Sequence, residues 1–339
     1  MGKFINAAAM VIAVGLLAGA APAKADPFKI RVGWATTPTH VQPLIDELQK
    51  RHPEVFPRFG KSYVAEGMRF NGSTPQLQAL AINELELAAF GPSVVSLAVN
   101  NAHLDLRIVA DVFQDGVPGH SSVRYVVLAD GPVKKVEDLK GRRVGTNAIG
   151  SFGDSTMRVM MRKHGLSDKD FTSIEVGLGN MPAMLQESKV DLIALIPPYR
   201  YYLANGKFRL LFTGHDAQGI SQAQIFAMRA DVIAEHRAAL VDFFEDHIRA
   251  LRWMIDPAHH DEDVAIAMTV TKAKKEDLDY LFSEEDSYRD PDARPNLEAT
   301  QHAIDNDLSL GVIQKGITVA PKYVDLSMIE DAKKRIDGK

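Results

Sequence analysis

The sequence predicts an α/β fold of two lobes with a ligand cleft between them. Strand-like and helix-like segments alternate over short connections, which favours parallel strands covered by helices on both faces. The alternation occurs in two blocks, which are joined by two polar stretches at 114–121 and 215–222. With 339 residues, the chain is long enough for one large or two medium domains that each bury a core.

The first 25 residues have the pattern of a secretory signal peptide. Lys3 precedes an almost unbroken apolar run at 4–20, and the small residues at 23–25 form a cleavage site before Asp26. A membrane-spanning helix needs roughly 20 apolar residues, so this run is short for a retained anchor, which is the alternative. We therefore expect a periplasmic protein that is cleaved after Ala25.

Composition and motifs disfavour several classes of function, and we expect neither a cofactor nor a metal. The chain has no cysteine, and its formal net charge of −5 comes without a basic tract. Such a chain is a poor candidate for binding nucleic acid or an anionic membrane. It also lacks a thiol nucleophile, the catalytic patterns HExxH and GxSxG, and a phosphate-cradling loop. No catalytic residue is expected.

The first block contains four expected strands and three expected helices. The strands are expected at 28–35, 63–70, 85–90 and 106–113, and the helices at 41–50, from about Pro75, and at 93–100. Proline suits the first turn of a helix, and Ser73 or Thr74 would cap this one. Ligands bind beyond the carboxyl ends of the strands in such sheets, so the turns after these strands are candidate site segments.

The second block is expected to form the other lobe. Its strands are expected at 123–129, 173–178, 190–196 and 208–214, together with a buried strand before the turn at 150–152. Helices are expected from Ser151, at 181–189 and just after Pro198. The chain then returns through a strand at 223–228 and a long helix after Asp231. The apolar stripe of that helix is expected to comprise Leu240, Phe243, Phe244, Leu251 and Met254.

These blocks place residues 26–118 and 224–339 in lobe 1 and residues 119–223 in lobe 2. The remainder of the chain, to residue 339, is expected to contain helices and loops without further sheet. We expect the two polar stretches to form a hinge, because each is a point where the chain crosses between the lobes.

The turn at 150–152 is a candidate for contact with an anion. The helix that opens at Ser151 has unpaired backbone N–H groups at the positive end of its dipole. Gly150 and Ser151 would present these groups, and Phe152 would cover the ligand. In the structural alternative, Ser151 and Asp154 form a capping box that satisfies the helix end. A carboxylate at Asp154 would repel an anion, or hold the amine of a zwitterionic ligand.

Five further side chains are candidate contacts. Trp34 ends the first strand and has either a stacking role or a core role. His40 and His120 lie in turns, where histidines are either ligand contacts or surface residues. Tyr199 and Arg200 follow a buried strand. A guanidinium grips a carboxylate or sulfonate at two points, and tyrosine supplies an apolar wall with a hydroxyl.

Two other motifs favour plain structural roles. The stretch at 177–182 looks like a dinucleotide fingerprint, but Pro182 replaces the third small residue that this fingerprint needs. The consecutive histidines and acids at 259–263 point in different directions on a helix, so they suit one metal ion poorly. We expect a solvated helix start there.

Four segments, at 70–93, 106–112, 136–153 and 297–313, carry a resemblance over most of the mature chain. They resemble the nitrate/sulfonate/taurine (SsuA/THI5-like) family of periplasmic substrate-binding proteins of ABC transporters. The resemblance implies a type II periplasmic-binding-protein fold, in which each lobe is a mostly parallel sheet flanked by helices. It also implies ligand contacts from the turns near Thr37, Ser73, Thr74, Ser93, Ser151 and Tyr199.

The expected function is that of a monomeric receptor that passes a small organic anion to an inner-membrane ABC permease by hinge closure. The ligand would be a sulfonate, a taurine-like molecule, or an aromatic or dicarboxylic acid. The stretch at 197–201 departs from the family pattern and favours a larger anion. The alternatives are a pyrimidine or thiamin-precursor binding or biosynthetic protein of the same fold, and a sensory ligand-binding protein.

Overall fold

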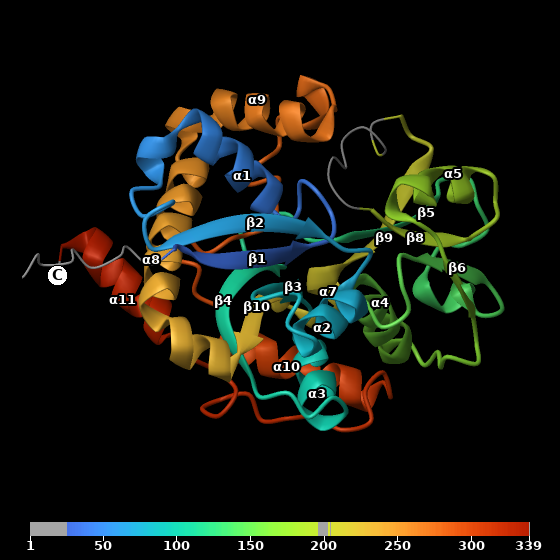
Figure 1. The fold of residues 1–339 in the computed structure, drawn as a ribbon. Coiled ribbons are helices and arrows are strands. Elements are labelled where there is room, and N and C mark those ends of the chain that lie inside the picture. Colours follow the sequence, from blue (N-terminus) through green and yellow to red (C-terminus); the bar gives the residue numbers. More distant parts are fainter. Residues whose placement is uncertain (1–25, 196–202, 204, 339) are drawn as a thin grey trace, which may run out of the picture.

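The computed structural model describes residues 26–195, 203 and 205–338, which form two β-sheets with helices packed around each (Figure 1). The expected short helix after Pro198 lies outside the described residues. Among the helices of the described ranges, none combines the length and the apolar character that a membrane crossing requires.

The first sheet joins a two-stranded part to a three-stranded part. Its strands are β1 (Phe28–Trp34), β2 (Tyr63–Arg69), β3 (Ala88–Phe90), β4 (Leu106–Asp115) and β10 (Ser221–Arg229). Strand β1 pairs with β2 in parallel, and a parallel bridge from Val32 to Leu87 connects β1 to the start of β3. Strand β10 lies between β3 and β4 and is antiparallel to both.

The second sheet has the strand order β7-β6-β8-β5-β9. Its strands are β5 (Arg124–Leu128), β6 (Arg143–Thr146), β7 (Thr172–Glu175), β8 (Leu192–Leu195) and β9 (Phe208–Thr213). Strands β7, β6 and β8 run in parallel, and β5 is antiparallel to β8 and β9.

The expectation of mostly parallel sheets is confirmed, with one antiparallel strand in each sheet: β10 opposes the other strands of the first sheet, and β5 opposes those of the second. The chain leaves the first sheet along β4 and comes back into it along β10, so these two neighbours run in opposite directions. The second sheet is likewise entered along β5 and left along β9. Strand–helix alternation predicts the parallel pairs within a block, but it does not show how strands that cross between blocks pair.

Helices cover both faces of the sheets (Figure 1). The α-helices are α1 (Gln42–Arg51), α2 (Ser73–Ala81), α3 (Ser93–Asn100), α4 (Phe152–Lys163), α5 (Met181–Gln186), α7 (Gly214–Gln218), α8 (Ala230–Ile255), α9 (His260–Thr271), α10 (Leu297–Ser309) and α11 (Ser327–Asp337). Short 3-10 turns are η1 (Pro53–Val55), η2 (Val136–Leu139), η3 (Leu178–Asn180), η4 (Pro257–His259) and η5 (Lys275–Asp277).

The core is divided between the faces of the two sheets. On one face of the first sheet, α1, α8, α9 and α11 pack through residues such as Leu44 and Phe244. On the other face, α2, α3 and α10 pack through residues such as Leu80 and Ile304. The expected apolar stripe of α8 is confirmed, since all five of its residues are buried. Helix α4 covers one face of the second sheet, and α5 covers the other.

The start of α2 differs from its expected form. The helix begins at Ser73, its N-cap is Gly72, and no side chain caps it. Neither Ser73 nor Thr74 therefore has the expected capping role. Gly72 has an extended backbone with φ 164°, which leaves the N–H groups of the first turn without a side-chain acceptor at the cap position.

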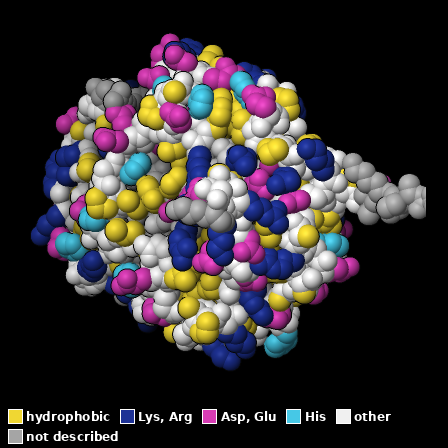
Figure 2. Space-filling view, turned by 90° about the vertical axis from the view of Figure 1, so that its left-hand side faces the viewer, with side chains coloured by type: hydrophobic (Ala, Val, Ile, Leu, Met, Phe, Trp, Pro, Cys, Tyr) yellow, Lys and Arg dark blue, Asp and Glu magenta, His cyan; other side chains and the backbone are white. Residues whose placement is uncertain are grey.

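The surface over α8 and α11 carries charges of both signs. Figure 2 shows Lys and Arg side chains interspersed with Asp and Glu on this side of the molecule. Ion pairs join the two helices, with Arg335 Nη1 2.6 Å from Asp242 Oδ1 and Arg237 Nη2 2.8 Å from Asp331 Oδ2. A face of alternating charge has no single-sign field of the kind that nucleic-acid binding uses.

Candidate functional site

A cavity of about 300 Å³ lies where turns of both sheets meet. Its lining includes the turns that follow β1, β2 and β3 of the first sheet and β6 of the second. Residues of α10, the end of α7 and the start of β10 complete the wall. The carboxyl ends of parallel strands are the places where such sheets bind ligands, and this volume suits a small molecule.

Three helices begin at this cavity. Ser73 of α2, Ser93 of α3 and Phe152 of α4 are the first residues of their helices, and all three line it. The first N–H groups of a helix have no partner within the helix and lie at the positive end of its dipole. Helices α2 and α3 belong to the first sheet and α4 to the second. An anion in the cavity would therefore be stabilised from both sides.

The turn at 150–152 combines capping with exposure to the cavity. Ser151 is the N-cap of α4, and its Oγ accepts a hydrogen bond from Asp154 N at 3.3 Å. Asp154 Oδ2 accepts from Gly150 N at 2.9 Å, one residue before the position that a capping box uses. Gly150 has a φ of +77°, in the left-handed region that favours glycine. Gly150, Ser151 and Phe152 all line the cavity.

Asp154 itself is not part of the cavity wall. Its side chain is fully buried, and its Oδ2 lies 2.8 Å from Arg158 Nε. Arg158 also contacts Asp168 at 2.7 Å and Ser173 Oγ at 3.0 Å. The carboxylate is therefore paired with Arg158 beneath the cavity wall and does not contact a ligand there, although, in addition to burial, its charge contributes to the raised pKa of Asp307 in that wall.

His40 lies in the cavity wall as a neutral group. It is 7% exposed, and burial lowers its pKa to about 4. Its Nδ1 lies 3.1 Å from the carbonyl oxygen of Thr36. Its Nε2 makes no well-aligned hydrogen bond to any described residue. A neutral imidazole can donate to or accept from a ligand at that nitrogen.

The acidic group of the cavity is Asp307 of α10, which the sequence analysis missed. It is 7% exposed, and burial raises its pKa, while the nearby hydroxyls of Ser155 and Ser93 lower it in part. Ser93 Oγ, Ser155 Oγ and Asp307 Oδ1 each lack a well-aligned hydrogen bond to a described residue. Ser93 belongs to α3 and Ser155 to α4, so Asp307 lies between the starts of helices from both sheets.

The described lining contains no lysine and no arginine. Asp307 and His40 are its titratable side chains, and amide side chains such as Asn147 and Gln224 supply neutral polar groups. No sequence signal marked Asp307 or these amides. A carboxylate on a helix is usually a solvent-exposed residue, and only the path of the C-terminal segment brings this one to the turns of the other elements.

The structure brings together seven of the predicted contact residues. These are His40, Ser73, Thr74, Ser93, Gly150, Ser151 and Phe152. Trp34 instead lines a small adjoining hollow, with Arg69 over its ring at 5.8 Å. Tyr199 and Arg200 lie outside the described residues.

Thr37 and His120 do not line the cavity. Thr37 Oγ1 is buried without a hydrogen-bond partner in the described part of the chain. His120 packs edge-on against the ring of Tyr288, with the ring centroids 5.1 Å apart. Thr37 was expected from the family resemblance and His120 from its position in a turn, and neither criterion determines which way a side chain faces.

The run at 259–263 is only partly solvated, which corrects the expectation of a solvated helix start. Asp263 is fully buried, and His259 stacks on Trp253 with ring centroids 4.1 Å apart. Among the described residues, no group of three or more His, Asp or Glu side chains is arranged to hold a metal ion.

The family model of the NMT1/THI5-like proteins matches residues 70–259. The chain belongs to the NMT1/THI5-like family. The matched segment runs from the turn after β2 to the end of α8 and η4, so it contains the second sheet and most of the cavity wall. The expected family membership is thereby confirmed.

Solved structures of low sequence identity share the fold. The alkanesulfonate-binding protein SsuA from Xanthomonas axonopodis pv. citri, bound to MOPS, is 20% identical with a TM-score of 0.66, over 88% of this chain and 98% of that one. The periplasmic nitrate-binding protein NrtA from Synechocystis PCC 6803 is 14% identical with a TM-score of 0.70, over 92% and 90%. The two-lobed α/β fold of periplasmic binding proteins is thus confirmed.

The same fold also occurs in an enzyme. The desulfurization enzyme DSZB is 12% identical with a TM-score of 0.63, over 91% of this chain and 99% of that one. Fold alone therefore does not distinguish binding from catalysis, and the chemistry of the cavity has to decide.

Proposed function

We propose that the chain is a periplasmic solute receptor of an ABC importer, which captures a small organic anion between two lobes. The observation that supports this most strongly is the common cavity at the starts of α2, α3 and α4. Dipoles and N–H groups from both sides attract an anion without a fixed positive charge in the described lining. Fixed, neutral donors of this kind suit a receptor that must also release its ligand.

We further propose the lobe boundaries and the motion. Residues 26–118 and 224–339 form lobe 1, residues 119–223 form lobe 2, and the connections between β4 and β5 and between α7 and β10 act as the hinge. Contacts from both lobes give a bound ligand a higher affinity for the closed form, and this difference shifts the population toward closure. A signal peptide removed after Ala25 would export the chain as a monomer, and an inner-membrane permease would receive the ligand.

Asp307 narrows the class of ligand. A second carboxylate on the ligand would meet its buried carboxyl group, so a dicarboxylic acid is disfavoured. A ligand with an anionic group at the helix starts and an ammonium or hydroxyl donor near Asp307 satisfies both ends. Among the expected ligands, a taurine-like aminosulfonate has this pattern. We therefore assign to Asp307, rather than to Asp154, the role of binding the amine of a zwitterionic ligand.

A thermal-shift screen of the mature chain against taurine, alkanesulfonates, aromatic acids, dicarboxylic acids, nitrate and pyrimidines tests the proposal. We expect aminosulfonates to raise the melting temperature most, and X-ray scattering to show a smaller radius of gyration once the hit is bound. A pyrimidine as the only hit would favour the thiamin-precursor alternative. No shift with any organic anion would contradict the proposal.

A further inference from the structure

We propose that lobe 1 carries a second ligand site, for a small organic amine, in a cavity between α1, β2 and α8. This cavity has a volume of about 220 Å³ and shares no lining residue with the cavity between the lobes. Drug-sized ligands occupy roughly 300–1,000 Å³, so the occupant is a smaller molecule. We call it the lobe 1 cavity.

Four aromatic side chains contribute to its wall. Phe56, Phe59, Tyr63 and Phe243 line the cavity. The ring of Tyr63 is edge-on to the rings of Phe243 and Phe59, at centroid distances of 5.5 and 5.7 Å. An aromatic ring attracts a cation that lies over its face through its quadrupole, and the attraction is strongest where water is excluded.

Two polar atoms in this wall lack a partner. Gln42 and His247 are each 3% exposed and line the cavity, and neither Gln42 Oε1 nor His247 Nδ1 has a hydrogen-bond partner among the described residues. Gln42 Nε2 donates to Asp46 Oδ1 at 2.7 Å, and because an ionised carboxylate only accepts, the orientation of the amide is fixed. Its oxygen is therefore an unused acceptor, which calls for a donor such as an N–H group.

Asp46 supplies a carboxyl group to the same wall. Burial raises its pKa to about 6, while hydrogen bonds from Gln42 and the Gly67 amide lower it. Above that pH the carboxylate is a partly desolvated anion in a partly aromatic cavity, and an ammonium group beside it would compensate its charge. Lys50 also lines this cavity and lowers the pKa of Asp46 through its charge, but its side chain is exposed and lies 3.3 Å from Glu47, with which it pairs.

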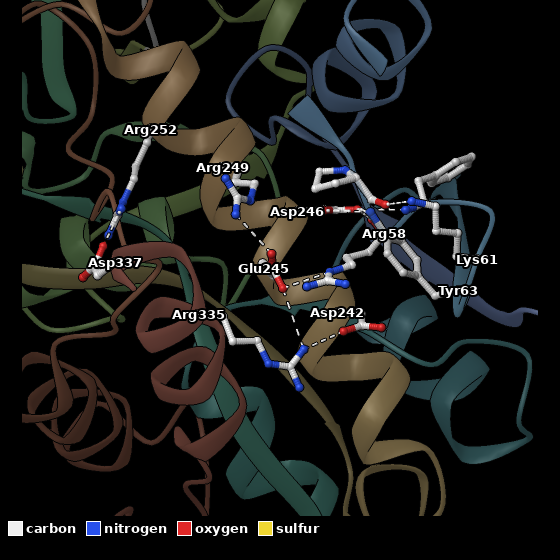
Figure 3. A network of polar contacts seen from close by, with 12 residues as sticks. Arg58, Lys61, Tyr63, Asp242, Glu245, Asp246, Arg249, Arg252, Arg335 and Asp337 are labelled. Carbon is white, nitrogen blue, oxygen red and sulfur yellow. Dashed lines mark hydrogen bonds and ion pairs between the residues drawn. The ribbon is translucent and has the colours of Figure 1, made fainter. Parts of the chain in front are cut away.

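The other charged groups behind the cavity are committed to each other (Figure 3). Asp246 accepts hydrogen bonds from Arg58 N at 3.0 Å, from Phe59 N at 2.9 Å and from the Tyr63 hydroxyl at 2.8 Å. The neighbouring Glu245 contacts Arg58 and Arg249, each at 3.1 Å. This network holds the aromatic wall in place and leaves the contacts of Gln42, Asp46 and His247 for the ligand.

Calorimetric titration of the mature chain with benzylamine tests the site, with benzyl alcohol and benzoate as matched probes. We expect benzylamine to bind with a Kd below about 1 mM near pH 7.5, and benzyl alcohol at least tenfold more weakly. Asp46→Asn and the cavity-filling Ala65→Leu should each weaken benzylamine binding at least tenfold. Ser73→Trp, which obstructs the cavity between the lobes, should leave it unchanged.

Three results would overturn the assignment. They are equal binding of benzyl alcohol, loss of benzylamine binding in Ser73→Trp, and no heat with benzylamine at about 10 mM. If Asp46→Asn or Ala65→Leu fails to fold, NMR spectra of the wild type decide. Benzylamine must then perturb the resonances of Phe56 and Phe59 and not those of Ser93. The result is independent of whether the other cavity binds an anion.

Discussion

Arg158 Nε lies 2.8 Å from Asp154 Oδ2, and this ion pair holds the carboxylate outside the lining of the cavity between the sheets. Asp154 is fully buried, and Arg158 is 9% exposed. Asp154 therefore stabilises the backbone of this turn, while the first residue of α4 lines the cavity. Gly150 N donates to Asp154 Oδ2 at 2.9 Å, and Ser151 N donates to Ala148 O at 3.1 Å. The N–H groups available to an anion at the start of α4 are therefore those of Phe152 and Gly153 rather than those of Gly150 and Ser151.

Replacing Arg158 with alanine should destabilise the protein by about 3–5 kcal/mol, because a buried carboxylate would lose its partner. Chemical denaturation measures this loss. Lys163→Ala is the matched control, since Lys163 is an exposed residue of the same helix and should change stability by less than about 0.5 kcal/mol. Similar stabilities for the two variants would show that the pair does not hold this turn.

Asp263 should make stability fall as the pH rises. Its carboxyl is fully buried without a hydrogen-bond partner among the described residues, and burial raises its pKa to about 8 from a usual value of 3.8. Between these values the unfolded chain has released the proton and the folded chain retains it, so raising the pH favours unfolding.

Asp263→Asn should remove this penalty. We expect the variant to gain about 2–4 kcal/mol more relative to wild type at pH 8 than at pH 5, as measured by urea denaturation. Asp261→Asn, at an 88% exposed side chain of the same helix, is the control and should show no such gain. If the difference in stability between Asp263→Asn and wild type did not change with pH, the raised pKa of Asp263 would be refuted.

Asp307→Asn should change ligand selectivity. Removing the carboxylate takes away the partner of a ligand ammonium and the repulsion of a second anionic group. We expect affinity for taurine to fall at least tenfold, about 1.4 kcal/mol, and affinity for an alkanesulfonate without an amine to be equal or higher. Asp305→Asn, at an exposed position of α10, is the control in parallel calorimetric titrations. Equal losses for both ligands would remove Asp307 from the recognition of the amine.

Arg200 is predicted from its sequence position to grip the anionic group of the ligand. Arg200→Ala should weaken ligand binding at least tenfold, about 1.4 kcal/mol, with little change in the melting temperature of the unliganded protein. Arg294→Ala, at a 59% exposed side chain, serves as the control. An affinity that does not change in Arg200→Ala would exclude the guanidinium from the site.

The turns that line the cavity could be predicted from the sequence. The residues that come to the cavity from distant parts of the chain could not. The turns at Ser73, Ser93 and Ser151 could be placed because each follows a strand and opens a helix, which are local patterns. Asp307 could not be found, because its position depends on how α10 packs against α3 and α4. The packing of the His120 ring against Tyr288 and the pairing of β10 with β4 also depend on contacts between distant parts of the chain.

Asp154 shows that a local sequence pattern can predict a helix start without predicting where a side chain of that start lies. The spacing of Ser151 and Asp154 correctly indicated a helix start, but the ion pair with Arg158 four residues further on decided the direction of the carboxylate. Burial of both side chains, rather than capping preference, determines the outcome, and burial is a property of the folded lobe.

Titration of the best-binding organic anion into wild-type protein and into Ser73→Trp, side by side in a calorimeter, tests the central claim most directly. We predict one-to-one binding to the wild type and a loss of at least a hundredfold, about 2.7 kcal/mol, in the variant, whose indole would fill the space between the helix starts. Undiminished binding to a folded Ser73→Trp protein would show that the cavity between the lobes is not the ligand site.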